Sequence, residues 1–347
     1  RLALLDELGI TAEVLFPNTA PPFLPTGAIS APPPQTQKEY EYRFAGLRAH
    51  NRWMADFCSE GKGRWGGFAQ IFVNDIDAAA DEVRWAKDAR LAGILLPSDH
   101  VLGLVNMYEP KFDALWAACA ESGLPVHRHQ VFPAQTVDEG GPAAPWIGML
   151  QIPFFARRAL AQFLCTGILE RFPSLKVVFT ELSESVTLNA YVDELDEWYR
   201  VGLNPSGPGT RSSLVHPAVM QLSKPPSDYF RSNCYIGAPL DVNKSIIAGT
   251  PNLMFGADLP HSEGPGALTP KAVRIEAALV GESEVDAFLY KRAVDVYGFD
   301  TALLQNVANK IGATRAEVRR PLLSEDRPSY PDETRCMAFA HADAFHQ

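Results

Sequence analysis

The sequence predicts an α/β protein with a (β/α)8 TIM-like barrel, and three observations lead to this fold class. Short apolar runs alternate with helical segments along most of the chain, as in a parallel sheet that is buried on both faces. The length of 347 residues suits one large barrel. No GxGxxG follows the first strand and no GxxxxGK[ST] occurs anywhere, which disfavours the open doubly wound sheets that bind nucleotides.

The apolar runs predict seven strands, each bounded by turn residues or by a helical segment. They are expected at residues 13–17, 66–73, 92–97, 124–130, 175–182, 233–238 and 253–261. Seven βα units suit an eight-stranded barrel whose first strand is missing from the given chain, and the first residue is Arg1 rather than Met. We expect one barrel domain over residues 1–311 and a tail over residues 312–347 that packs on the barrel or on a partner subunit.

Helices are predicted between these strands from apolar spacing and from the glycines that end them. They are expected at residues 1–9, 41–61, 75–87, 111–122, 153–172, 188–198 and 284–297. The long connections at 17–37 and 203–228 are rich in proline or in loop-forming residues. Long loops in compact domains are usually functional or disordered, so we expect these two to cover the mouth of the barrel or a subunit interface.

Composition excludes several classes of protein. The chain is 46% hydrophobic and 21% charged, which is too apolar for a disordered chain, and no apolar run approaches the ~18 residues that span a bilayer. A net charge of −10 argues against nucleic acid or an anionic membrane as a partner. The five cysteines form no CxxC pair and indicate reduced thiols in a cytoplasmic protein. The expected partner is a small-molecule substrate.

Histidines end one predicted strand. His127 and His129 share a face of the strand, because side chains alternate across it, and His129 lies nearer the end where barrel enzymes place catalytic groups. Imidazole nitrogen binds Zn, Mn and Fe well. We expect His129 to bind a metal and His127 to contact substrate, although a histidine satisfied by neighbouring hydrogen bonds is the simpler reading of His127.

Single carboxylates end two further strands. Glu181 is the only charge after an apolar run and could serve as a base, bind a metal, orient a ligand or form a salt bridge at the rim. Asp258 follows a buried run and is placed to bind a metal and to accept a proton from its bound water. His261 lies on the loop over the mouth as a candidate substrate contact. Trp146 is another, although it suits the core equally well.

At these residues the sequence resembles the amidohydrolase-related family, which includes aminocarboxymuconate-semialdehyde decarboxylase. The resemblance covers residues 1 to about 300. It is carried by the segments LDELGITAEVLFP, NRWMADFCSEGKGRWGGFAQI, GLPVHRH, LERFPSLKVVFTELSESV, MFGADLPHSEG and VDVYGFD. In this family the last histidine of the segment like GLPVHRH is a metal ligand and the aspartate of the segment like MFGADLPHSEG is both ligand and proton shuttle, which maps these roles onto His129 and Asp258.

Two departures from the family shape the functional prediction. Nothing before Leu2 supplies the HxH or ExH metal motif of the family's first strand. Glu181 stands where the family's decarboxylases carry a histidine, and a glutamate there resembles a branch of predicted metal-dependent hydrolases. The resemblance therefore implies a hydrolase in which Asp258 and Glu181 act on water bound to one divalent ion, with zinc preferred and manganese or another ion possible.

Two alternatives stay open. One is a metal-dependent, non-oxidative decarboxylase of an aromatic or unsaturated acid. The other is a non-catalytic barrel that binds a ligand through a depleted metal site. The resemblance also implies a homodimer.

Overall fold

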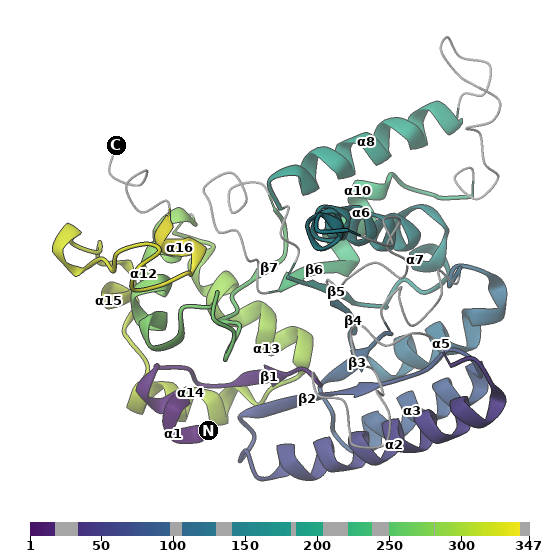
Figure 1. Cartoon of the computed structure of the whole chain (residues 1–347), viewed down its shortest axis with the longest axis horizontal. Helices are drawn as coiled ribbons and strands as arrows, with labels where there is room; N and C mark the ends of the chain where they lie inside the picture. Colours follow the sequence, from purple (N-terminus) through teal and green to yellow (C-terminus); the bar gives the residue numbers. More distant parts are fainter. Residues whose placement is uncertain are drawn as a thin grey trace.

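The computed structural model describes residues 1–17, 34–97, 106–129, 141–181, 185–203, 221–237, 250–280 and 282–340. Within them, seven parallel strands form one curled sheet in the order of the chain, with β1 and β7 at its edges (Figure 1). The strands are β1 (Glu13–Leu15), β2 (Trp65–Gln70), β3 (Gly93–Leu95), β4 (Val126–His129), β5 (Val177–Thr180), β6 (Cys234–Gly237) and β7 (Leu253–Met254). All seven predicted strands are present, and the predicted α/β barrel class is confirmed.

Helices follow the strands and lie outside the sheet (Figure 1). Those between β1 and β6 are α2 (Gln37–Ser59), α3 (Ile76–Asp88), α5 (Asp113–Ser122), α6 (Ala144–Cys165), α7 (Ile168–Arg171), α8 (Ser185–Leu203) and α10 (Pro226–Asn233). The terminal ones are α1 (Leu2–Glu7), α12 (Thr269–Leu279), α13 (Arg292–Tyr297), α14 (Thr301–Ile311), α15 (Arg315–Arg319) and α16 (Met337–Ala340). Single turns of 3-10 helix span Pro110–Phe112, Gly266–Leu268 and Ser324–Asp326, and a π-helical turn spans Ala287–Lys291.

Some predicted helices differ from the observed ones. The helix expected at 153–172 is two helices, because Gly167 adopts a left-handed backbone (φ 80°) that ends the first and begins the second. Helices α10, α12 and α14 were not predicted. Helix α14 begins where the Asp300 side chain accepts a hydrogen bond from the Leu303 N–H group. Of the two long connections, residues 18–33 and 204–220 lie outside the described residues.

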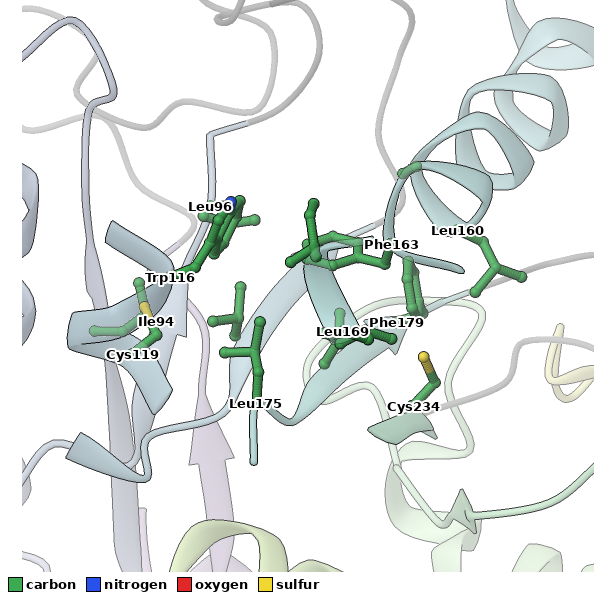
Figure 2. Packing of buried hydrophobic residues seen from close by; sticks show 14 of the residues in the cluster. Ile94, Leu96, Trp116, Cys119, Leu160, Phe163, Leu169, Leu175, Phe179 and Cys234 are labelled. Atoms are coloured by element: carbon green, nitrogen blue, oxygen red, sulfur yellow. The ribbon is translucent and has the colours of Figure 1, made fainter. Parts of the chain in front are cut away.

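The main core lies between the outer face of the sheet and its helices. Figure 2 shows Ile94 and Phe179 from the sheet among side chains of the helices, including Trp116 and Phe163. The Trp116 indole N–H group donates to the Met107 carbonyl at 3.0 Å, so its one polar atom is satisfied in the core. Burial of this face fixes which side chains of each strand point outward, and the alternate side chains therefore point into the curl of the sheet.

The inner face of the sheet carries an aromatic layer. The His127 ring is fully buried and lies 4.0 Å from the Phe68 ring and 5.5 Å from the Tyr297 ring, measured between centroids. Phe16 contacts the same imidazole edge-on at 5.4 Å. These rings fill the interior of the curled sheet below the carboxyl ends of the strands. A ligand can therefore enter the interior only above this aromatic layer.

Helix α1 and the C-terminal segment up to residue 340 pack against neighbouring helices. Gly9, just after α1, approaches the Ile311 carbonyl at the end of α14, and the two helices lie side by side in Figure 1. Residues of the C-terminal segment, Leu322, Cys336 and Phe339, pack with Ala272 and Ile275 of α12 in a small apolar cluster.

None of the cysteines forms a disulfide. No helix among the described residues has the length and apolar character needed to cross a membrane.

Helix α12 also buries a carboxyl group. Glu276 is 6% exposed, and burial raises its pKa from 4.5 to about 8. Between these values the folded protein keeps a proton that the unfolded chain has released, so the free energy of unfolding falls as the pH rises from about 4.5 to about 8.

We expect Glu276→Gln to stabilise the protein at neutral and alkaline pH, because the amide carries no charge to bury. The gain should be near zero at pH 4 and reach at most roughly 3 kcal/mol at pH 7, from 1.36 kcal/mol per pKa unit. Urea unfolding at several pH values measures it. Glu121→Gln, on an exposed position of α5, is the matched control. Parallel pH profiles for Glu276→Gln and the wild type would contradict the prediction.

Candidate active site

A cavity of about 1210 Å³ runs along the gap between the edge strands β1 and β7 and reaches the carboxyl ends of the inner strands. It is bordered by β1 on one side, by the segment after β7 on the other, and by the terminal helices α1, α13 and α14. Four of the residues predicted from sequence line it together, namely His129, Glu181, Asp258 and His261. The strand-end argument therefore locates one common site.

Glu181 is held directly after β5 by its own backbone. Its N–H group donates to the Gly237 carbonyl of the neighbouring strand at 3.1 Å, which fixes the point where β5 ends. Its φ is 57°, a left-handed conformation that few residues other than glycine adopt. Backbone of this kind costs free energy and is typical of functional sites.

Asp258 is placed by a tight turn after β7. Its φ is 47°, and its carbonyl accepts the His261 N–H group at 2.8 Å. This turn brings the His261 Nδ1 atom to 3.0 and 3.1 Å from the two Asp258 carboxylate oxygens. The imidazole is 39% exposed while the carboxylate is 13% exposed, so His261 connects Asp258 to solvent.

His129 meets Glu181 across the two strands that carry them. Its Nε2 atom lies 3.2 Å from Glu181 Oε1, and both side chains are largely buried. The Phe16 ring packs edge-on against the His129 imidazole, with centroids 5.3 Å apart. His129 is thus fixed between an aromatic ring and a carboxylate.

The two carboxylates share one electrostatic environment. Burial, and then the nearby charge of Glu181, raise the pKa of Asp258 from 3.8 to about 6. Burial opposes ionisation of Glu181, but hydrogen bonds from His129 and Asp258 outweigh it and lower the pKa of that carboxyl. When the pair holds one proton, that proton is therefore on Asp258, and the protonated carboxyl group donates a hydrogen bond to Glu181.

The donor set fits a divalent ion. One ligand atom each from Glu181, Asp258 and His261 lies within 4.8 Å of the others. Oxygen and imidazole ligands suit several divalent metals, and a metal charge would offset the cost of two buried carboxylates close together. Of the predicted ligands, Asp258 belongs to this group, whereas His129 adjoins it through Glu181.

Two predicted substrate contacts lie elsewhere. His127 is enclosed in the aromatic layer, does not line the cavity, and has no hydrogen-bond partner for either ring nitrogen among the described residues. Burial, and then the proximity of His129, lower its pKa to about 3, so it stays neutral. Trp146 lies on α6, is 68% exposed and is not a lining residue. Neither position supports a substrate contact.

The sequence reasoning overlooked Thr180. It ends β5, immediately before Glu181, and lines the cavity with a hydroxyl that has no hydrogen-bond partner within the described structure. Thr180 pairs in register with His129 and so shares its inner face. The sequence signal for it is its position directly before Glu181 at the end of the apolar run.

A curled parallel sheet with acidic and imidazole groups at the carboxyl ends of its strands is the arrangement of TIM-barrel enzymes. The chain belongs to the amidohydrolase family, whose model matches residues 10–299. This confirms the family resemblance, and the protein is an enzyme.

Known relatives cover most of the chain. It is 23% identical over 301 residues to gamma-resorcylate decarboxylase of Rhodococcus jostii, covering 82% of each protein. It is 22% identical over 274 residues to that of a Rhizobium species, covering 75% of this chain and 76% of the relative.

Solved structures show the same fold. The 5-carboxyvanillate decarboxylase of Novosphingobium aromaticivorans, with bound manganese and 3-methoxy-4-hydroxy-5-nitrobenzoic acid, matches with a TM-score of 0.68 and 19% identity, over 86% of this chain and 80% of that one. The 5-carboxyvanillate decarboxylase of Sphingomonas paucimobilis matches with a TM-score of 0.62 and 22% identity, over 86% and 82%.

These comparisons correct the functional prediction. The relatives named above are decarboxylases rather than hydrolases, so the prediction of a metal-dependent hydrolase is wrong. It rested on Glu181 in place of a histidine, and a carboxylate at that point is compatible with either chemistry because it is a metal ligand or a proton acceptor in both.

The site predicts opposite effects of Asp258→Asn on stability and on metal affinity. In the metal-free protein at pH 8 the amide removes a charge held beside Glu181. Because the Asp258 carboxylate keeps some contact with solvent and with the partly exposed His261, screening limits the gain to about 1 kcal/mol. Thermal unfolding in a chelator should show a higher Tm, whereas calorimetric titration with Mn²⁺ should show at least about tenfold weaker binding.

Asp81→Asn serves as the control, because its carboxylate is 78% exposed and pairs with Arg84, which is itself exposed. It should alter neither quantity. A Tm for Asp258→Asn below that of the wild type, together with unchanged Mn²⁺ affinity, would show that Asp258 is a structural hydrogen-bond acceptor instead.

Proposed function

We propose that the protein is a metal-dependent, non-oxidative decarboxylase of a hydroxylated aromatic carboxylic acid. The carrying observation is the buried Glu181–Asp258 carboxylate pair in the cavity. Its support comes from the named relatives, which act on gamma-resorcylate or 5-carboxyvanillate.

The charge of the site favours a bound cation. The groups nearest to Asp258 are Glu181 and the imidazole of His261, and an anionic substrate would meet repulsion from two carboxylates in a poorly solvated cavity. When bound by Glu181, Asp258 and His261, a divalent ion supplies the positive charge that attracts the substrate carboxylate and an adjacent ring oxygen. The residues thus fit both the metal and the relatives' class of substrate.

Asp258 is the proposed proton donor. Loss of CO₂ breaks the bond between the ring and the carboxyl carbon and leaves an electron pair on the ring carbon, which must receive a proton. Asp258 lies in the cavity, so its carboxyl group is placed to deliver that proton to the ring carbon. His261 hydrogen-bonds the same carboxyl group and is partly exposed, so it connects Asp258 to solvent.

His129 acts on Glu181, the other member of the carboxylate pair. The His129 contact favours the ionised form of Glu181, which is the form that binds a metal ion. His129 is therefore a positioning residue in this proposal, as well as a side chain that lines the cavity.

The metal is manganese or a similar ion in this proposal. Two solved structures of the Novosphingobium decarboxylase hold manganese, which favours manganese over the zinc predicted from the sequence. A cytoplasmic homodimer with a barrel over 1–311 and a tail over 312–347 remains the prediction from the sequence.

Release of CO₂ is the direct test. Incubation with 2,6-dihydroxybenzoate or 5-carboxyvanillate and Mn²⁺ should yield one CO₂ and one decarboxylated phenol per substrate. Chelation should abolish turnover and added Mn²⁺ should restore it more fully than Zn²⁺. Asp258→Asn should lower kcat by about 10²–10⁴, the usual contribution of a general acid.

Asp81→Asn should leave kcat unchanged. Tight binding of these acids without CO₂ release would favour the non-catalytic barrel, and the absence of both binding and turnover would overturn the proposal.

A further inference from the structure

Thr180 carries a buried hydroxyl that no described residue satisfies. The residue is 4% exposed, and its Oγ1 atom has no hydrogen-bond partner within the described structure. Native proteins rarely leave such a group unpaired, because burying it costs free energy that a partner would return. An unpaired group that lines a cavity is therefore a candidate for pairing with whatever enters that cavity.

The register of the sheet shows where this hydroxyl lies. Thr180 pairs with His129 of β4 on one side and with Gly237 of β6 on the other. All three residues line the cavity, so they form one row on the inner face, one residue deeper than Glu181. A ligand held at Glu181 and Asp258 reaches this row with the substituents that point into the barrel.

Gly237 leaves room beside the hydroxyl. A Cβ atom built on Gly237 would lie 3.7 Å from Thr180 Oγ1 and 3.6 Å from Val178 Cγ1, both ordinary contact distances. A side chain as small as that of alanine therefore fits there in the ligand-free protein. Glycine at this position therefore leaves room next to Thr180 for about one added heavy atom, the size of a ring oxygen.

We propose that the Thr180 hydroxyl binds a ring oxygen of the aromatic acid, in the space that Gly237 leaves open. This inference rests on the proposed function. In the proposed function, the substrate carboxylate and one adjacent oxygen lie at the metal site formed by Glu181, Asp258 and His261. The oxygen at Thr180 is therefore a second ring substituent. A hydroxyl both donates and accepts, and it therefore selects acids that carry this second oxygen over acids that lack it.

The test compares two probe ligands in the manganese-loaded protein, 2,6-dihydroxybenzoate and 2-hydroxybenzoate, which lacks the second ring hydroxyl. Because the manganese-loaded protein is expected to turn over 2,6-dihydroxybenzoate, steady-state kinetics gives the KM for that acid and the inhibition constant of 2-hydroxybenzoate. Thr180→Val should raise this KM about tenfold, the size of one hydrogen bond to a polar or charged partner, and change the inhibition constant of 2-hydroxybenzoate little. Thr180→Ser, which keeps the hydroxyl, should restore the preference. Gly237→Ala should weaken 2,6-dihydroxybenzoate selectively by filling its space.

The stability of the ligand-free protein separates binding from structure. Because the hydroxyl has no partner, Thr180→Val should leave Tm unchanged or raise it. Thr250→Val is the matched control, since Thr250 is also buried but accepts a hydrogen bond from Asn189 at 3.4 Å and does not line the cavity. It should lower Tm and leave both affinities unchanged.

The outcomes distinguish this inference from the proposed function. If the wild type binds 2,6-dihydroxybenzoate but Thr180→Val binds it equally well, or weakens both probes alike, the role of Thr180 is overturned and the decarboxylase proposal stands. If Thr180→Val lowers Tm as Thr250→Val does, the hydroxyl is structural. If the wild type binds neither probe and releases no CO₂, both proposals fail.

Discussion

The close approach of the Glu181 and Asp258 carboxyl groups is the constraint on which the site depends. Two carboxylates placed together at a half-buried position repel one another, and burial alone already disfavours their charge. The fold holds them there with two left-handed residues, because Glu181 and Asp258 themselves have positive φ. Such backbone and such charge are both unfavourable for stability, so their coincidence at one point marks a site shaped by chemistry rather than by packing.

The parallel sheet makes this approach possible. Strands β5, β6 and β7 pair in register, so that the ends of β5 and β7 lie on either side of β6. Glu181 is anchored to β6 through the Gly237 carbonyl, and Asp258 follows β7 by a turn closed on His261. Below them the aromatic layer around His127 fills the interior. A rigid floor and two anchored carboxyls thus limit the space in which a ligand is held.

The sequence predicted the features that depend on a single strand, namely its position and the polar residue at its end. Apolar runs located every strand, because a sheet covered by helices needs continuous apolar residues, and the polar residue that ended each run pointed to Glu181, Asp258 and His129. The proximity of Glu181 to Asp258 was not predictable, since it depends on two turns far apart in sequence. The described structure places Trp146 and His127 away from the cavity, which the sequence did not indicate either. An aromatic residue on a helix and an imidazole in a strand carry no sequence mark that tells cavity from surface or core.

The correction from hydrolase to decarboxylase follows from the same chemistry. An acidic pair with a histidine partner can activate water in one enzyme and deliver a proton in another, and the residues alone do not separate these roles. What separates them is the ligand that the rest of the cavity accepts. Beneath the carboxylates the row of His129, Thr180 and Gly237 offers an imidazole, a hydroxyl that no described residue satisfies, and room for a small group. A flat ring with an oxygen substituent is the ligand proposed for this row. In that proposal its carboxylate lies beside Asp258, where loss of CO₂ would leave a carbon that needs a proton.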